Sequence, residues 1–272
     1  MKVLVTGLSG VVGQAIIEKL KDRYEVSALS RYGTPGIEKK NDFIGDITEP
    51  NSILSAFKDQ EVVVHLAADR SMNAGFDSTL KYNITGTYNV YEAARISGVR
   101  RVVYGSSQHV VGGFYRVSPY KEIFTGDFSN VNYPIQLLDE KTPIRPSGFY
   151  GMSKVHGESL GQYYQDYHGI STISLRIGWT LSNDRPQFSG ASLALWLSHR
   201  DTAELHIRAI EAPENIGYTC VFGTSNNYWK VFSLQHAKDM IGFQAKDDAG
   251  RELDHQLTQL ERDDTEFKMH SP

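Results

Sequence analysis

The sequence has a single cysteine, Cys220, in a chain of 272 residues. One cysteine excludes an intrachain disulfide and a thiolate metal cluster. No His, Asp and Glu grouping has metal-ligand spacing either, so we predict no metal site. Lys and Arg number 28 against 32 Asp and Glu, a net charge of −4. That balance provides no basic surface for nucleic acid or anionic lipid.

Long apolar runs are also missing from the sequence. None approaches the roughly 18 residues that a membrane span needs, and the N-terminal segment lacks the apolar core of a signal peptide. Hydrophobic residues make up 40% and charged residues 22%, which is typical of a chain that buries a core. These features predict a cytoplasmic globular protein with no membrane or nucleic-acid partner.

Short apolar runs alternate with amphipathic stretches, which is typical of βαβ units on a parallel sheet. We therefore predict a doubly wound α/β sheet with a small C-terminal substrate-binding lobe, all within one extended domain. The expected core is about 1–178, the lobe about 179–245 and a charged surface tail about 246–272. Strands are predicted over 2–6, 25–30, 42–47, 61–68, 101–107 and 171–179, and helices over 80–97 and 150–168.

The pattern breaks between residues 110 and 147. This stretch is rich in Gly, Pro, Tyr and Asn, so the prediction there is a loop without regular structure. Loops of that length inside a compact domain are uncommon and usually functional.

Three glycines, Gly7, Gly10 and Gly13, stand between the first strand and the first helix. This spacing allows a tight turn, close approach of a pyrophosphate and close packing of the helix on the strand. The helix N-terminus supplies unpaired N–H groups and partial positive charge for a phosphate. The alternative is a turn that needs flexible residues and binds nothing. Because the glycines follow a strand and open a helix, we predict a Rossmann-type dinucleotide site.

The end of the second predicted strand, Ser30-Arg31, has no acidic residue. An acidic residue there binds the ribose 2′-hydroxyl of NAD, whereas an arginine accommodates the 2′-phosphate of NADP. Ser30 and Arg31 can both donate to a phosphate, so NADP is favoured over NAD. The alternative is that Arg31 is a solvated surface side chain.

Tyr150 and Lys154 are four residues apart on one face of a predicted helix. A phenol titrates near pH 10, and a neighbouring ammonium would favour its deprotonated form. The fifth strand ends at Ser106-Ser107, on the edge of the sheet that faces the cofactor crevice in such folds. Ser107, Tyr150 and Lys154 are therefore the candidate catalytic residues.

The combined motifs resemble the extended short-chain dehydrogenase/reductase family over nearly the whole chain. They are, in order, Gly7-x-x-Gly10-x-x-Gly13, Gly45-Asp46-Ile47, His65-Leu66-Ala67-Ala68, Asn83, Ser106-Ser107 and Tyr150-x-x-x-Lys154. More narrowly, the sequence resembles the uronate dehydrogenases and the archaeal glucose-6-phosphate dehydrogenases, which oxidise the anomeric carbon of a sugar to a lactone.

The resemblance implies that Tyr150 is the base, that Lys154 supports it and binds ribose, and that Ser107 bonds the reacting oxygen. Asn83 would place the helix beneath the site. The cofactor-binding set expected is Gly7, Ser9, Gly10, Val11, Val12, Gly13, Ser30, Arg31, Asp46, Ile47, Leu66, Ala67, Ala68, Asn83, Tyr150, Lys154 and Ile177.

The expected substrate-binding residues depart from the family pattern at two positions. Gln108 stands where the family has Asn, and Trp179 where it has a small serine. An arginine can grip a phosphate or carboxylate bidentately or instead form a surface ion pair with an aspartate. The full substrate set expected is Arg70, Ser107, Gln108, His109, Tyr150, Trp179 and Arg185.

Several alternatives stay open. His109 can contact a sugar or only support its loop, and His65 in its apolar strand is expected to be a core residue. A nucleotide-sugar epimerase is the alternative enzyme, and a non-catalytic dinucleotide sensor is a third possibility. By resemblance, copies of the chain pair as a homodimer or higher homo-oligomer through residues 80–97 and the tyrosine-bearing helix.

Overall fold

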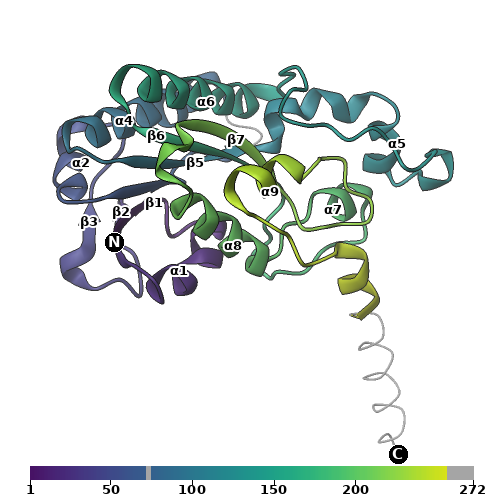
Figure 1. The fold of residues 1–272 in the computed structure, drawn as a ribbon, viewed down its shortest axis with the longest axis horizontal. Coiled ribbons are helices and arrows are strands. Elements are labelled where there is room, and N and C mark those ends of the chain that lie inside the picture. Colours follow the sequence, from purple (N-terminus) through teal and green to yellow (C-terminus); the bar gives the residue numbers. More distant parts are fainter. Residues whose placement is uncertain (72–74, 256–272) are drawn as a thin grey trace, which may run out of the picture.

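A computed structural model describes residues 1–71 and 75–255. It confirms the predicted α/β class: a seven-stranded sheet has the order β3-β2-β1-β4-β5-β6-β7, and every neighbouring pair is parallel (Figure 1). The strands are β1 (Lys2–Thr6), β2 (Glu25–Ser30), β3 (Asp42–Ile44), β4 (Val62–His65), β5 (Arg101–Ser107), β6 (Ser171–Ile177) and β7 (Tyr218–Gly223).

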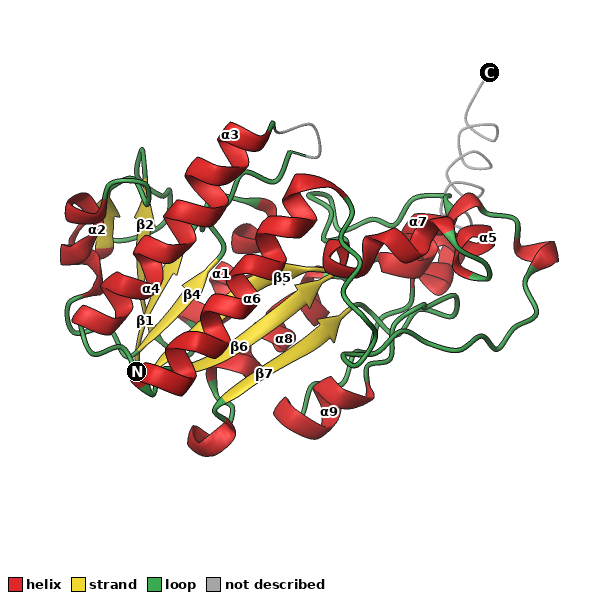
Figure 2. Cartoon of the chain, turned by 90° about the horizontal axis from the view of Figure 1, so that it is seen from above, coloured by secondary structure: helices red, strands yellow, loops and turns green. Residues whose placement is uncertain are grey.

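Successive side chains of the central strands point to opposite faces, and helices cover both. Val3 and Val5 pack in the core beneath α1 and α8, whereas Leu4 between them packs beneath α2 and α4. Figure 2 shows α4 and α6 running side by side over one face of the sheet. The helices are α1 (Val11–Lys21), α2 (Pro50–Phe57), α3 (Phe76–Ser78), α4 (Gly86–Ile96), α5 (Tyr120–Thr125), α6 (Gly148–His168), α7 (Gly190–Leu195), α8 (His199–Ile210) and α9 (Gln235–Ile241).

The stretch 110–147 is not the irregular loop that its composition predicts. It contains most of a 3-10 helix (Gln108–Arg116), then α5 and a 3-10 turn (Phe128–Asn130). Its apolar side chains, including Val111 and Ile123, pack into a separate core with residues from α7, β7 and 231–232. This small core explains why so many aromatic residues accompany the prolines and glycines.

The predicted boundary at residue 178 does not coincide with a break in the fold. Strand β7 belongs to the main sheet, and α8 packs against α1. The second core instead combines residues from before and after that boundary. Simple periodicity missed β7 and α8, whose burial depends on packing against β6 and α1.

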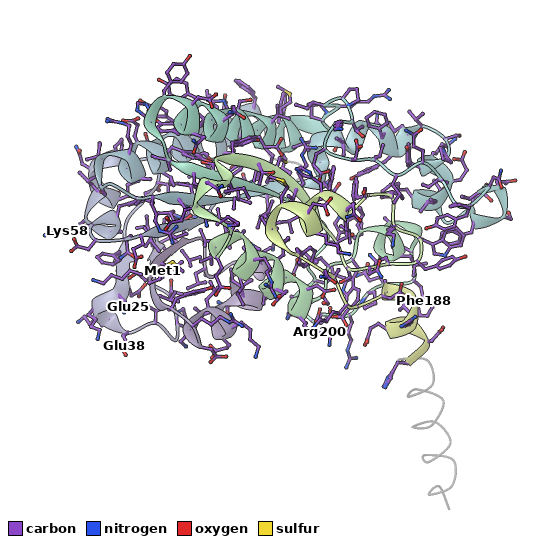
Figure 3. All side chains as sticks on the ribbon, in the orientation of Figure 1. Met1, Glu25, Glu38, Lys58, Phe188 and Arg200 are labelled. Atoms are coloured by element: carbon purple, nitrogen blue, oxygen red, sulfur yellow. The ribbon has the colours of Figure 1, made fainter. Side chains whose placement is uncertain are left out.

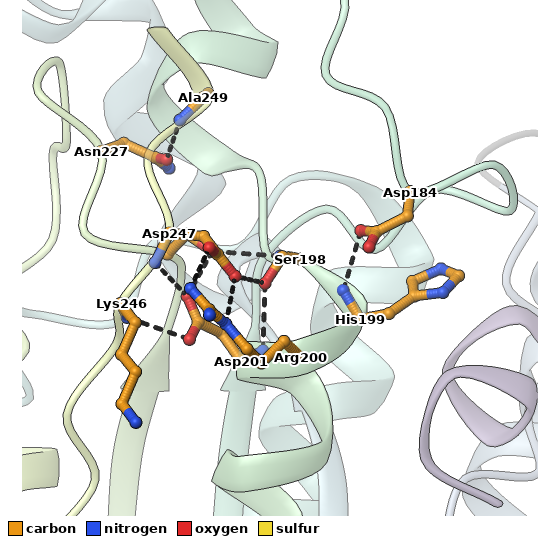
Figure 4. Close-up of polar contacts among 10 residues, drawn as sticks. Asp184, Ser198, His199, Arg200, Asp201, Asn227, Lys246, Asp247 and Ala249 are labelled. Atoms are coloured by element: carbon orange, nitrogen blue, oxygen red, sulfur yellow. Dashed lines mark hydrogen bonds and ion pairs between the residues drawn. The ribbon is translucent and has the colours of Figure 1, made fainter. Parts of the chain in front are cut away.

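The first part of the predicted surface tail is anchored to the body of the protein. The Asp201 side chain is 1% exposed and accepts hydrogen bonds from the backbone N–H groups of Lys246 (2.9 Å) and Asp247 (3.0 Å). Asn227 accepts one from Ala249 N–H at 3.0 Å, and Arg200 pairs with Asp247 (Figure 4). Residues 246–249 are therefore part of the fold, and 256–272 lie outside the described residues.

In Figure 3, Glu25, Glu38 and Lys58 project from the end of the molecule opposite to Phe188. No helix in the described ranges combines the length and apolar character that crossing a membrane would need.

The order of the sheet reverses direction between β1 and β4, so a crevice opens at the carboxyl ends of these strands.

Candidate active site

A cavity of about 710 Å³ lies at the carboxyl ends of the strands. It extends from the loop between β1 and α1, past the ends of β2, β4 and β5, to α6 and the loop after β6. This is the position at which doubly wound sheets bind their ligands.

The glycine loop brings the backbone very close to its neighbours. Gly7 has a φ of +75°, and a Cβ on it would lie 2.6 Å from the nitrogen of Ala67. A Cβ on Gly13 would lie 2.3 Å from the carbonyl oxygen of Leu8. Glycine is therefore required at both positions.

The N-terminus of α1 opens onto this loop. Gly10 at its start provides no side-chain cap, and the first turn carries no acidic residue. The first N–H groups of the helix are therefore available to an anion, which fits the pyrophosphate of a dinucleotide.

The end of the cavity beside β2 and β3, where we expect the adenosine of a dinucleotide, is lined by Ser30, Arg31, Asp46 and Ile47. The Arg31 guanidinium lies 5.5 Å from the ring centroid of Tyr32 and 5.7 Å from that of Tyr82. Tyr82 also lines the cavity and is absent from the predicted set, because it lies in the segment after β4, far along the sequence from the glycine motif.

Ser107, Tyr150 and Lys154 meet in the same cavity. Ser107 Oγ accepts a hydrogen bond from His109 N–H at 3.2 Å, and its hydroxyl also bonds with Tyr150. Burial raises the pKa of Tyr150 to about 12, while a hydrogen bond with Ser107 and the charge of Arg70 act to lower it. Ser107 and Tyr150 therefore place two neighbouring hydroxyl groups in the cavity.

Lys154 is the buried cation beside the tyrosine. It is 3% exposed, its Nζ donates to the carbonyl oxygen of Gly105 at 2.7 Å, and Nζ lies 5.4 Å from the Tyr150 ring centroid. Burial lowers its pKa to about 8, and the charge of Glu158 opposes this. One helical turn separates Lys154 from Glu158.

Glu158 ties α6 to the ends of two strands. Its Oε1 accepts from Ser106 Oγ at 2.6 Å, and Arg176 binds both carboxylate oxygens at 3.0 and 2.9 Å. Sequence reasoning missed this pair, although Glu158 continues the helix face that carries Tyr150 and Lys154. The network holds that face against β5 and β6.

Asn83, predicted among the cofactor-binding residues, does not line the cavity. It is 1% exposed, its Nδ2 donates to Asp69 O (2.8 Å) and Ser153 Oγ (3.2 Å), and its Oδ1 accepts from Asp69 N–H. Asn83 therefore joins the loop after β4 to α6, the helix that the resemblance implied it would help to place. His65, as expected, is a core residue bonded to Thr6 and Thr87.

The substrate end, by which we mean the end where a substrate is expected, is lined by Arg70, Gln108, His109 and Trp179. Nδ1 of His109 bonds to Ser147 Oγ at 2.8 Å, and burial lowers the pKa of its ring.

Arg185, predicted among the substrate-binding residues, is exposed and does not line the cavity. Its backbone N–H donates a hydrogen bond to Asn183 Oδ1 within the loop. The loop turns away here because Asp184, at φ +53°, binds the His199 N–H at the start of α8.

The structure brings the other predicted cofactor and substrate residues together around this one cavity. Sequence reasoning missed further lining residues, namely Leu29, Gly45, Asp69, Tyr82, Gly105, Ser106, Gly178, Thr180 and Leu181. Among the described residues, no group of three or more His, Cys, Asp and Glu is arranged to hold a metal ion.

Comparison with known proteins places this site in context. The chain is 33% identical over 253 residues to the NAD-dependent glucose-6-phosphate dehydrogenase of Haloferax volcanii, covering 91% of this chain and 94% of the relative. It is 33% identical over 258 residues to the L-arabinose 1-dehydrogenase (NAD(P)(+)) of the same organism, covering 91% and 97%.

The crystal structure of uronate dehydrogenase from Agrobacterium tumefaciens has a similar fold, with a TM-score of 0.77 and 30% identity over 93% of this chain and 87% of that one. The model of the NAD dependent epimerase/dehydratase family matches residues 3–220. With its glycine loop, its Tyr150–Lys154 pair and this match, the chain belongs to the NAD-dependent epimerase/dehydratase family.

Proposed function

We propose that this protein oxidises C1 of a small sugar to the lactone with a nicotinamide dinucleotide. The sugar is an aldose, a hexuronate or a hexose 6-phosphate. The observation that carries the proposal is the convergence of Ser107, Tyr150 and Lys154 beside a donor-lined substrate end. Relatives named as glucose-6-phosphate, arabinose and uronate dehydrogenases support the reaction class.

The residues of the chain divide the chemistry between them. Ser107 donates to the C1 oxygen and orients it, and Tyr150 takes the hydroxyl proton as C1 is oxidised. Lys154 stabilises the phenolate electrostatically. When bound, the nicotinamide ring supplies the hydride acceptor. The cavity walls hold the sugar in one orientation, which raises the rate by proximity.

For the cofactor, we propose NADP over NAD. Arg31, at the end of β2, lies near the rings of Tyr32 and Tyr82, and an arginine at this strand end can bind a 2′-phosphate. Ser30, with no acidic neighbour at that strand end, adds a second donor.

We expect Arg31→Gln to lower kcat/KM for NADP about 10- to 100-fold, the loss typical of hydrogen bonds to a charged group. The value for NAD should stay within about threefold, because that cofactor has no 2′-phosphate. Saturation kinetics with each cofactor measure both ratios. Equal losses for NADP and NAD would contradict the assignment.

Arg70 is the candidate anion-binding residue, since it is exposed at the cavity and its charge acts on the pKa of Tyr150. If the natural sugar is anionic, Arg70→Met should raise KM for it about 10- to 100-fold. KM for L-arabinose should stay unchanged. Arg185→Met is the matched control, because Arg185 is an exposed arginine outside the cavity. An equal rise in both variants would exclude Arg70 as the specific contact.

The proposed function is tested by incubating the protein with glucose 6-phosphate, glucuronate, galacturonate and L-arabinose, each with NAD and with NADP. We expect reduced cofactor and lactone with at least one pair. A nucleotide-sugar epimerase would instead interconvert its substrate with no net reduction and would keep its cofactor through gel filtration. A dinucleotide sensor would bind cofactor and convert no sugar.

Homo-oligomer formation stays a prediction. Tyr163 and Tyr167 on α6 are 48% and 73% exposed, and Tyr88 on the neighbouring α4 is 48% exposed. Aromatic side chains of this kind suit a subunit interface.

A further inference from the structure

Gln108 follows Ser107 directly, lines the cavity and is 1% exposed. Its side-chain oxygen, Oε1, accepts a hydrogen bond from the hydroxyl of Tyr115. The same hydroxyl lies 3.3 Å from the main-chain oxygen of Gln108. The side-chain oxygen and the main-chain oxygen of Gln108 therefore both face the Tyr115 hydroxyl.

Tyr115 is held firmly behind the site. It stands on the 3-10 helix Gln108–Arg116, and its ring packs on Phe124 of α5 with centroids 3.9 Å apart. Tyr115 does not line the cavity. Burial raises its pKa well above the usual value, so at neutral pH it keeps the proton that it donates.

The amide nitrogen of Gln108 makes no hydrogen bond within the part of the chain that the structure describes. It is also absent from the buried side-chain atoms that lack a partner there. Because Gln108 lines the cavity, its two N–H groups are open on the cavity side. A primary amide carries a donor end and an acceptor end, and the contact with Tyr115 decides which end faces the substrate.

We propose that Tyr115 is a positioning residue that fixes the Gln108 amide, so that position 108 offers only donors and selects a substrate oxygen that accepts. The inference rests on the proposed sugar oxidation. Ser107 and Arg70 also offer donors at this end. The substrate class is therefore a sugar that presents a carboxylate, phosphate or hydroxyl oxygen here. A protonated amino sugar, which offers only donors at that position, is rejected.

The test removes only the Tyr115 hydroxyl. With the best sugar of the panel above, Tyr115→Phe should raise KM about tenfold, the equivalent of one net hydrogen bond. kcat should stay within about twofold, because the amide contact forms in the ground state and the transition state alike. Tyr120→Phe is the matched control. It removes a hydroxyl bonded to the main chain of Gln136 in the same segment, and it should leave KM unchanged.

A double-mutant cycle separates positioning from general damage. In a Gln108→Ala background, Tyr115→Phe should change KM by less than about twofold, because the group that Tyr115 orients is gone. Gln108→Glu should raise KM more than Gln108→Asn, since a carboxylate replaces the donor with an acceptor.

An active wild type whose KM is unaffected by Tyr115→Phe would overturn this inference and leave the proposed function intact. Additive effects of Tyr115→Phe and Gln108→Ala would overturn it as well. A wild type that oxidises no sugar would overturn the proposed function and the inference together.

Discussion

Tyr150→Phe should lower kcat for sugar oxidation at least about 100-fold, the usual contribution of a positioned general base. The variant removes only the hydroxyl, so the ring that contacts His109 and Lys154 stays in place. Most of the cofactor contacts that we propose lie along the glycine loop and the strand ends, so the cofactor Kd should stay within about threefold of the wild-type value. Single-turnover kinetics and cofactor titration measure the two quantities.

The control for this experiment is Tyr163→Phe, which removes a hydroxyl from an exposed tyrosine on the same helix. It should retain wild-type kcat. Near-normal turnover by Tyr150→Phe would show that another group takes the proton.

Lys154→Met should lower kcat about 100-fold, because the variant loses the charge that stabilises the phenolate. It should also unfold at a higher temperature than the wild type at pH 7. Burial lowers the pKa of Lys154 from 10.5 to about 8. Keeping this ammonium charged in the folded protein therefore costs on the order of 3 kcal/mol, and methionine removes that cost.

The stability difference should depend on pH with a defined sign. Between pH 8 and pH 10.5 the unfolded chain holds the Lys154 proton more tightly than the folded protein does. Wild-type stability from this residue therefore rises with pH in that window, and the advantage of Lys154→Met shrinks. Thermal unfolding of both proteins from pH 7 to pH 10 measures this. A variant less stable than the wild type at pH 7 would mean that the hydrogen bond to Gly105 outweighs the burial cost.

The sequence predicted the sheet because its strands are buried on both faces and read as continuous apolar runs, such as Val62-Val63-Val64. It also located the glycine loop, because a side chain at Gly7 or Gly13 would collide with neighbouring backbone atoms. Strand β7 and α8 escaped because their burial is decided by tertiary packing against β6 and α1 rather than by local periodicity.

The candidate site was predictable where residues follow a strand end or share a helix turn. Tyr82 and Glu158 reach the site through tertiary contacts, and spacing alone does not distinguish them from neighbouring polar residues. Arg185 shows the converse case. Its position in the sequence suggested a substrate contact, but the bond between Asp184 and His199 turns that loop outward.

The contacts of residues 110–147 were the least predictable part. Prolines and glycines interrupt the apolar periodicity of this segment. Its small core also includes residues of α7 and β7, so the core forms only when these elements pack against it. The bond from Tyr115 to Gln108 depends on that packing.

The most direct test of the proposed reaction uses a sugar carrying deuterium at C1, chosen as the best substrate of the panel. The wild type should transfer the deuterium to the nicotinamide ring, with one lactone formed for each reduced cofactor, as NMR and mass spectrometry of the products would show. Deuterium that stays on the sugar or exchanges into water would contradict oxidation at C1.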